Sequence, residues 1–323
     1  MIPFTYVVVY SSIAFIALLL IRLFIQGGRF NKSTRCDGKV ILITGANTGI
    51  GKETAQELLK RGGKVYIACR SLQKATQAKK ELMEETGELD IHVRELDLSS
   101  LESVRNFAKR FLAEEPRLDI LINNAGVMAC PKTLTKDGFE MQFGVNHLGH
   151  FLLTNLLLDR LKASAPSRIV NLSSLAHKFG QINKDDLNSE KSYSELGAYN
   201  QSKLANLLFT KELAKRLEGS GVTTYAVHPG AVYTDLQRHF GTLFFLLDNF
   251  VVRSLMQFTF KTPKEGAQTS VYAALDEDLS NKTGRYYADC QEVKPSKAAE
   301  NEETARWLWK VSEEMTGLSK KTS

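Results

Sequence analysis

The chain has 323 residues, of which 43% are hydrophobic and 24% are charged, and its formal net charge is +6. This composition, with a mean hydropathy of -0.20, excludes a disordered chain, a collagen-like chain and a membrane protein with many spans. Residues 1–36 hold four bases and no acid, so the other residues carry only +2, too little for a nucleic-acid-binding surface.

The first segment is strongly apolar. Residues 2–21 contain no charged side chain, and about 20 such residues span a hydrocarbon core. A signal peptide or a buried core helix are the alternatives, but no basic start or small-residue cleavage site is evident. The sequence predicts a single membrane anchor over 1–25 and a linker over 26–37. The bases Arg22, Arg29, Lys32 and Arg35 follow the anchor, which places the body in the cytosol.

The carboxyl-terminal lysines and the cysteines indicate the cellular compartment of the protein. The final residues, Lys320-Lys321-Thr322-Ser323, resemble the dilysine signal of endoplasmic-reticulum membrane proteins. A frayed lysine-rich terminus is the alternative interpretation. Four widely separated cysteines, without the spacing of a zinc site, indicate a reducing compartment and no metal centre. His147 and His150 are read as helix surface and core.

The rest of the chain alternates short apolar runs with helical stretches. Strands are expected at 39–44, 64–68, 91–96, 118–122, 168–172 and 222–227, with helices between them. Runs such as Val-Ile-Leu-Ile, apolar throughout, are typical of a parallel sheet covered on both faces. The pattern predicts an α/β fold, a Rossmann-type doubly wound parallel sheet, as a single domain over 38–323.

A glycine-rich turn follows the first predicted strand. The strand runs into Thr44-Gly45-Ala46-Asn47-Thr48-Gly49-Ile50-Gly51, directly ahead of a helix. Glycines at such a turn permit close backbone approach to a pyrophosphate, which then lies at the positive end of the helix. A P-loop is the rival interpretation, but Ile50 occupies its second glycine position and Glu53 replaces its Ser/Thr.

Three motifs in order resemble the short-chain dehydrogenase/reductase family over 39–287: this turn, Asn123-Asn124-Ala125-Gly126, and Tyr199-Asn200-Gln201-Ser202-Lys203. The resemblance implies a nicotinamide cofactor. It places Asp97 near the adenine, Pro229-Gly230 on the nicotinamide side and Thr234 at the carboxamide, and it implies that Asn123 steadies the central sheet against the cofactor.

The end of the second strand selects the cofactor. An acid there suits the ribose of NAD, whereas arginine suits the 2′-phosphate of NADP. The strand ends in Cys69-Arg70 without an acid, so we expect NADP(H) with Arg70 at the phosphate. A solvated turn residue is the alternative reading of Arg70.

Catalytic residues are expected on one helix and at the end of one strand. Tyr199 and Lys203 are four apart and share a helix face. The resemblance implies that Tyr199 is the general acid/base, that Lys203 lowers its pKa and holds the cofactor ribose, and that Asn146 holds a water. Ser174, with Tyr199, would bind the substrate oxygen. Its neighbour Ser173 should point to the opposite face of the strand.

The substrate is expected to be apolar. Residues 243–260 are rich in Leu, Phe, Val and Met, which suits a lid over a long hydrophobic molecule, a helix in the bilayer interface or a buried core helix. Five segments resemble the microsomal retinol dehydrogenases: 44–53, 66–70, 121–130, 145–154 and 223–229. This resemblance implies reduction of all-trans-retinal with NADPH and activity on lipid aldehydes. A steroid or fatty-aldehyde reductase and a non-catalytic nucleotide-binding protein are the alternatives. Membrane lipid and a homodimeric partner are further expectations.

Overall fold

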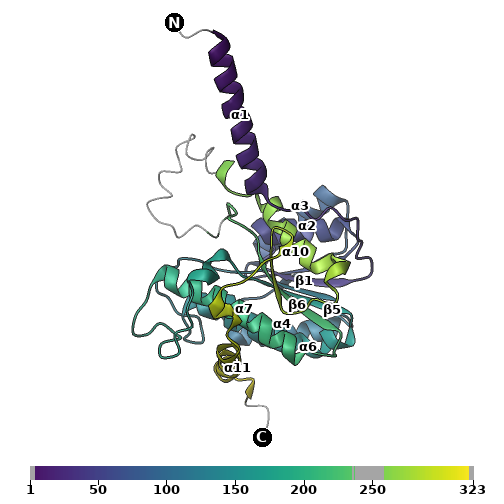
Figure 1. The fold of residues 1–323 in the computed structure, drawn as a ribbon. Helices are drawn as coiled ribbons and strands as arrows, with labels where there is room; N and C mark the ends of the chain where they lie inside the picture. The colour runs from purple at the N-terminus through teal and green to yellow at the C-terminus, as the bar shows by residue number, and fades with distance from the viewer. Residues whose placement is uncertain (1–3, 235, 237–257, 320–323) are drawn as a thin grey trace.

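The structure is a computed structural model that describes residues 4–234, 236 and 258–319. Its centre is a sheet with the strand order β3-β2-β1-β4-β5-β6-β7-β8, in which every pairing is parallel except that of β7 with β8 (Figure 1). The strands are β1 (Val40–Thr44), β2 (Lys64–Cys69), β3 (Ile91–Glu95), β4 (Ile120–Asn123), β5 (Ser167–Leu172), β6 (Val222–His228), β7 (Arg285–Ala288) and β8 (Gln291–Glu292).

Helices cover both faces of the sheet. They are α2 (Gly49–Lys60), α3 (Leu72–Thr86), α4 (Leu101–Glu114), α5 (Met141–Phe143), α6 (Gly149–Ala163), α7 (Glu195–Arg216), α10 (Pro263–Leu275) and α11 (Glu302–Thr316). The shorter turns are η1 (Gly144–Leu148), η2 (Leu175–Phe179), η5 (Glu277–Leu279) and η6 (Lys297–Glu300). Ile41 and Ile43 of β1 pack in the core under α2, α3 and α10, whereas Leu42 packs under α4, α6 and α7. Alternate residues of one strand thus face two apolar layers, as expected of a doubly wound sheet.

The predicted fold class is confirmed, and each of the six predicted strands is present within two residues of its expected bounds. The sequence analysis missed the hairpin of β7 and β8. These strands have four and two residues, and Asp289 and Cys290 between them adopt positive φ values of 51° and 56°. Asp often adopts such angles in hairpin turns whereas Cys does not, and strands this short show no clear alternation, so the sequence indicates the hairpin only weakly.

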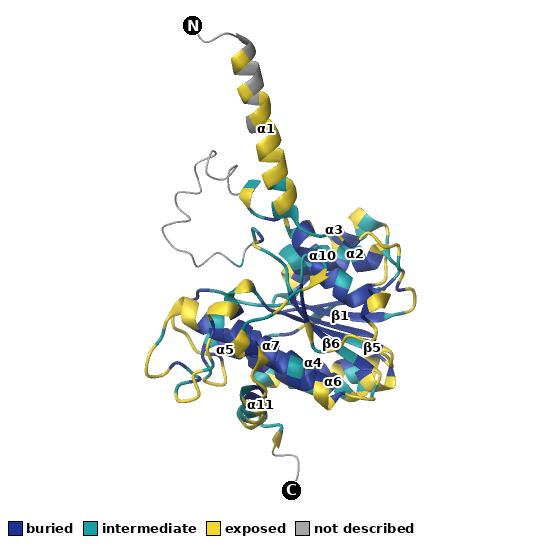
Figure 2. Ribbon diagram, in the orientation of Figure 1, coloured by how far each residue is buried: buried dark blue, intermediate teal, exposed yellow. Residues whose placement is uncertain are grey.

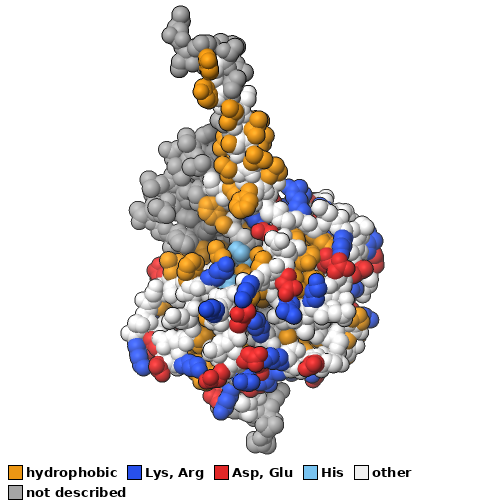
Figure 3. Space-filling view, viewed as in Figure 1, with side chains coloured by type: hydrophobic (Ala, Val, Ile, Leu, Met, Phe, Trp, Pro, Cys, Tyr) orange, Lys and Arg blue, Asp and Glu red, His pale blue; other side chains and the backbone are white. Residues whose placement is uncertain are grey.

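The amino-terminal helix α1 (Phe4–Gln26) projects from the globular body (Figure 1). Between Tyr6 and Phe24, the large apolar side chains that the structure describes are exposed, and Phe24 is 87% exposed. Figures 2 and 3 show this exposed apolar surface along the helix. Within the part of the chain that the structure describes, no helix is both long and apolar enough to cross a membrane.

The segment after α1, expected as a linker, has no helix or strand but packs against the body. Phe30 and Cys36 are buried, and the guanidinium of Arg61 lies over the Phe30 ring at 5.1 Å. At Gly28 an added Cβ would lie 1.9 Å from the carbonyl oxygen of Asp289, so glycine allows the chain to pass over the β7–β8 turn.

Two of the four bases in residues 1–36 are engaged by acids of the body. Arg22 donates two hydrogen bonds to Glu265, at 2.7 and 2.8 Å, at the start of α10. Lys32 lies 2.7 Å from Asp276 and 2.6 Å from Asp278. Arg22 and Lys32 therefore attach the amino-terminal segment to the globular body.

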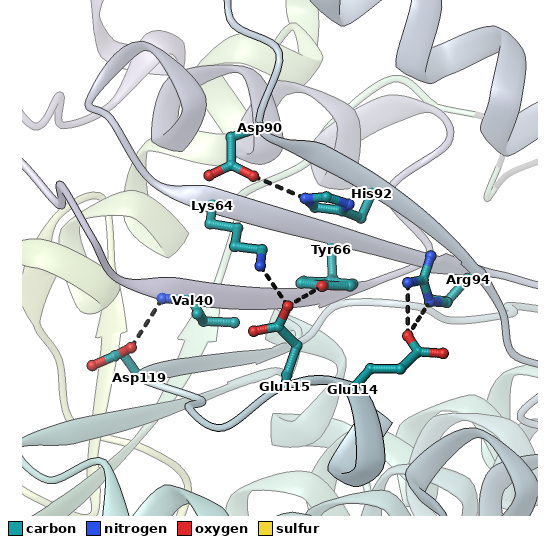
Figure 4. Close-up of polar contacts among 9 residues, drawn as sticks. All are labelled: Val40, Lys64, Tyr66, Asp90, His92, Arg94, Glu114, Glu115 and Asp119. Carbon is teal, nitrogen blue, oxygen red and sulfur yellow. Dashed lines mark hydrogen bonds and ion pairs between the residues drawn. The ribbon is translucent and has the colours of Figure 1, made fainter. Parts of the chain in front are cut away.

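A polar cluster supports the sheet next to its β3 edge (Figure 4). Glu115 accepts hydrogen bonds from Lys64, at 2.5 Å, and from the Tyr66 hydroxyl, while Arg94 pairs with Glu114. The His92 ring stacks on Tyr66 with centroids 4.7 Å apart. Each member of this cluster has a partner within the protein, which indicates a structural role.

Candidate active site

The predicted site residues come from different strands but meet at one edge of the sheet. Strands β1, β4, β5 and β6 are parallel, so the loops that follow them lie at the same edge. The strand order reverses between β1 and β4, and ligands of open α/β sheets bind in the crevice at such a point.

The glycine turn after β1 is pressed against the loop after β4. Gly45 and Gly49 have positive φ values of 66° and 58°. A Cβ at Gly51 would lie 2.5 Å from Asn124 Nδ2 and 2.6 Å from the carbonyl oxygen of Gly45. The glycines are therefore required by backbone conformation at two positions and by contact at the third.

Hydrogen bonds from Thr44 and Asn124 fix this arrangement. Asn124 Nδ2 donates to the carbonyl oxygens of Thr44, at 2.8 Å, and Gly45, at 3.2 Å. Thr44 Oγ1 accepts from the backbone amides of Asn124, at 2.9 Å, and Ala125, at 3.0 Å. Sequence analysis gave neither residue a role of its own, although both belong to the motifs that it used.

The competing P-loop interpretation receives no support from the contacts of Lys52. Its ammonium lies 2.6 Å from Glu81 and 3.5 Å from Glu85, both on α3. Lys52 thus links α2 to α3 instead of reaching over the turn. Arg70, at the end of β2, is exposed and makes no hydrogen bond or ion pair with any residue that the structure describes. Its guanidinium is available to an anion.

Asp97 and Asn123 differ in exposure and surroundings. Asp97 accepts hydrogen bonds from Ser99 N, at 3.0 Å, and Ser99 Oγ, at 2.6 Å, and pairs with Lys136. Burial opposes its ionisation, but these contacts outweigh burial and hold its pKa below the ordinary value. Asn123 is 2% exposed and donates to Thr154 and to Asn171, so its amide links β4 to α6 and β5.

The segment after β6 lies against the glycine turn. A Cβ at Gly49 would lie 3.3 Å from Thr234 Cγ2, which brings Thr234 beside the predicted pyrophosphate turn. Gly230, after Pro229, has a φ of 92°, and a Cβ there would meet the Lys261 side chain at 2.7 Å. The buried Lys261 pairs in turn with Asp289. The predicted lid residues 243–257 lie outside the described residues, and Phe258 and Phe260 are partly buried.

Tyr199 and Lys203 lie on α7, and Ser174 follows β5. The Tyr199 side chain is 5% exposed; burial raises its pKa to about 12, against the opposing effect of a hydrogen bond with Ser174. Lys203 Nζ donates to the carbonyl oxygen of Leu172 at 3.2 Å and lies 5.6 Å from the centre of the Tyr199 ring. Burial lowers the pKa of Lys203 to about 8.

The pKa of Tyr199 is raised, whereas the sequence led us to expect that Lys203 would lower it. Burial is the dominant influence on this phenol, and the cation at 5.6 Å lies over the ring. At neutral pH the phenol is therefore protonated, which is the form that can donate a proton.

Ser173 and Ser174 point in different directions, as their strand position predicts. Ser173 is buried, and its hydroxyl donates to the carbonyl oxygen of Lys203 at 2.8 Å. Ser174 is partly exposed and caps η2 by accepting from Ala176 N. Only the second hydroxyl is thus directed to the Tyr199 side of the site.

Asn146 lies in the π-helical turn η1 beneath these residues. Its side chain accepts from Val127 N, at 2.8 Å, and donates to Val127 O, at 2.9 Å. It also donates to Ser202 Oγ at 2.9 Å, between Tyr199 and Lys203 on α7. π-Turns are frequent at functional sites because they redirect a helix face. Here the turn connects the loop after β4 to the helix that carries the predicted catalytic pair.

A hollow of about 480 Å³ between α7, β7 and η6 is lined by charged side chains such as Lys211, Arg285 and Glu300. It includes no predicted catalytic or cofactor residue, so we do not assign it to the active site. Among the described residues, no three His, Cys, Asp or Glu side chains gather as metal ligands would.

Comparisons with known proteins agree with this geometry. Residues 39–242 match the family of short chain dehydrogenases. Retinol dehydrogenase 12 of Mus musculus is 53% identical over 309 residues, covering 96% of each chain. Retinol dehydrogenase 11 of Homo sapiens is 53% identical over 298 residues, covering 92% of each.

Solved structures show the same fold. An uncharacterised protein from Mycobacterium paratuberculosis has a TM-score of 0.73 and 38% identity, covering 90% of this chain and 98% of its own. A short chain dehydrogenase of Shigella flexneri, complexed with NADP, has a TM-score of 0.63 and 25% identity, covering 80% and 100%. The carboxyl-edge site, the family match and these relatives lead to one assignment: the chain belongs to the short-chain dehydrogenase family and is an oxidoreductase.

Proposed function

We propose that this oxidoreductase interconverts retinal and retinol with NADP(H), mainly by reducing all-trans-retinal. The observation that carries the chemistry is the buried, protonated Tyr199 beside Ser174 and Lys203 at the carboxyl edge of the sheet. The retinoid substrate is supported by relatives named retinol dehydrogenases, which exceed 50% identity over almost the whole chain.

The cofactor cradle fits a dinucleotide phosphate. The close contact of Gly51 with Asn124 and Gly45 keeps side chains out of the turn at the start of α2. Arg70 is an exposed guanidinium without a described partner, suited to the 2′-phosphate of NADP(H). In this proposal Gly45 to Gly51 hold the pyrophosphate, and Asp97 lies on the adenine side. Asn123 steadies the central sheet against the cofactor, and Pro229, Gly230 and Thr234 bound the nicotinamide side. NADPH, when bound, supplies the hydride.

In this proposal, side chains of the protein donate one proton to the substrate and stabilise the negative charge that develops. Ser174 Oγ and the Tyr199 hydroxyl bind the substrate carbonyl oxygen, and Tyr199 transfers its proton to that oxygen as the alcohol forms. The Lys203 ammonium stabilises the phenolate that remains, since a cation near an anion favours ionisation. Asn146, through its bond to Ser202, joins the turn η1 to the part of α7 between Tyr199 and Lys203.

Lipid-derived aldehydes are proposed as further substrates, because the segment 243–260 is rich in apolar residues. A reductase of steroids or fatty aldehydes keeps the same chemistry and is the second candidate, favoured by that composition alone. A non-catalytic nucleotide-binding protein would have no need of Ser174, Tyr199 and Lys203 together.

We also propose that α1 attaches the enzyme to the endoplasmic-reticulum membrane, with the body in the cytosol, and that the enzyme forms a homodimer. The exposed apolar side chains from Tyr6 to Phe24 support attachment to lipid, since soluble proteins rarely expose so large an apolar surface. The Arg22–Glu265 pair would hold this helix to the body at α10, beside α2.

Tyr199→Phe removes the proton donor, and we expect reduction of retinal to fall at least about 100-fold in kcat, the usual contribution of general acid catalysis. NADPH binding, followed by fluorescence, should persist. Tyr66→Phe, which removes the hydroxyl bonded to Glu115, is the matched control and should keep full activity. Turnover retained in Tyr199→Phe would refute the assignment of the donor.

The pH profile should follow Lys203, whose pKa is lowered by burial to about 8. The side chain is charged below that pH and neutral above it. We therefore expect kcat/KM for retinal reduction to decline as the pH rises through about 8. Initial rates from pH 6 to 10 measure this, and a profile that stays level to pH 10 would contradict the role of the ammonium.

Membrane attachment is tested on microsomes from cells that express the full chain. The protein should stay in the pellet after carbonate extraction, and added protease should digest its body in intact vesicles. The chain lacking residues 1–21, which keeps Arg22, should appear in the supernatant. Release of the full chain by carbonate, or protection of its body, would contradict an anchor with a cytosolic body. Chemical cross-linking of the same microsomes tests the homodimer.

A further inference from the structure

One buried histidine next to the site has no role in the chemistry proposed above. His150, near the start of α6, is 2% exposed, and both of its ring nitrogens have polar neighbours. Nε2 lies 2.8 Å from Thr44 Oγ1, and Nδ1 lies 3.1 Å from the carbonyl oxygen of Asn146. The ring therefore spans the gap between the residue before the cofactor turn and a predicted catalytic residue.

The hydrogen-bond partners of Thr44 determine where the ring carries its proton. Thr44 Oγ1 already accepts two backbone amide hydrogens, from Asn124 and Ala125, which use both of its lone pairs. Its own hydroxyl hydrogen is left to donate, and His150 Nε2 is the acceptor within reach. Nε2 must then be unprotonated, so in the neutral ring Nδ1 carries the hydrogen and donates it to Asn146 O.

The surroundings keep this ring neutral. Burial lowers the pKa of His150 to about 4, and the positive charge of Lys203 acts in the same direction. The charged groups near the ring thus oppose a second proton on it. At neutral pH a single tautomer satisfies Thr44, His150 and Asn146 at once.

The hydrogen-bonded chain through His150 has Thr44 at one end, beside the proposed cofactor turn, and Asn146 at the other, beside the predicted catalytic residues. Thr44 precedes Gly45 and holds the loop after β4 against the cofactor turn. Asn146 is fixed on its other side by Val127 and by Ser202 of α7. A change at one end of the ring is therefore transmitted to the other through two hydrogen bonds.

We propose that His150 is a positioning residue that couples the cofactor turn to the Asn146 carbonyl, through the neutral tautomer with hydrogen on Nδ1. This role rests on the proposed function, because it assumes that the turn binds the nicotinamide cofactor and that Asn146 supports catalysis. If His150 were only a hydrogen-bonded core residue, its substitution would lower the stability of the protein without changing Kd or kcat separately.

Two substitutions separate the two ends of the ring. In His150→Asn the side-chain amide takes the place of Nδ1 and can still donate to Asn146 O, but the contact with Thr44 is lost. In His150→Gln the side-chain oxygen reaches the place of Nε2 and can still accept from Thr44, but the contact with Asn146 is lost. We expect His150→Asn to raise the Kd for NADPH about 10-fold at near-normal kcat. His150→Gln should lower kcat about 10- to 100-fold at near-normal Kd, because small displacements of catalytic groups have effects of that size.

His147 provides the matched control. It is also fully buried, three residues earlier, but its ring bonds to Ser312 of α11 and packs among aromatic rings away from the cofactor turn. His147→Asn and His147→Gln should lower the Tm and leave Kd and kcat within about 2-fold.

The inference fails if the two His150 variants change Kd and kcat in the same proportion, or change neither. The Kd for NADPH is read by fluorescence without a carbonyl substrate, and kcat with whichever carbonyl compound is turned over, so a wrong retinoid assignment leaves this test intact. The ring nitrogen NMR shifts of ¹⁵N-histidine-labelled wild-type protein give a second test that needs no variant. We expect the tautomer with hydrogen on Nδ1 at pH 7, and hydrogen on Nε2 would overturn the proposal.

Discussion

The active site depends on the close approach of two backbone segments at the carboxyl edge of the sheet. The turn after β1 lies so near the loop after β4 that a side chain at Gly51 would collide with Asn124 and with the carbonyl of Gly45. Thr44 and Asn124 hold the two segments together by four hydrogen bonds. This contact forms the cradle at the amino end of α2 and also fixes the loop whose Val127 holds Asn146. The proposed cofactor turn and the predicted catalytic region therefore depend on the same contact between two backbone segments.

Burial governs the protonation states of the groups around that backbone. It keeps the Tyr199 phenol protonated and brings the pKa of Lys203 near 8, so one group can donate a proton while the other is still charged at neutral pH. The same burial keeps His150 neutral, which leaves one fixed tautomer between Thr44 and Asn146. The protonated phenol is the form of Tyr199 that the proposed reduction requires.

Much of the fold was predictable because apolar strands and glycine turns are local patterns. The six predicted strands follow from apolar runs, and the meeting of Gly49 with Thr234 and of Ser174 with Tyr199 follows from the order of the motifs along a parallel sheet. What sequence could not reveal are contacts between distant residues. The docking of the amino-terminal segment relies on Arg22 and Glu265, 243 positions apart. The bridge from Thr44 to His150 spans 106 positions, and both residues look like ordinary core positions in the sequence.

The central claim, that this chain is an NADPH-dependent retinal reductase, is tested most directly by initial rates on detergent-solubilised enzyme. NADPH and NADH are each compared with all-trans-retinal, a steroid ketone and nonenal. We expect the highest kcat/KM for retinal with NADPH. It should be at least about 10-fold higher than kcat/KM for retinal with NADH, because a charge-assisted bond from Arg70 to the 2′-phosphate is worth roughly 1.5–3 kcal/mol. Equal rates with the two cofactors, or a steroid preferred to retinal, would contradict it.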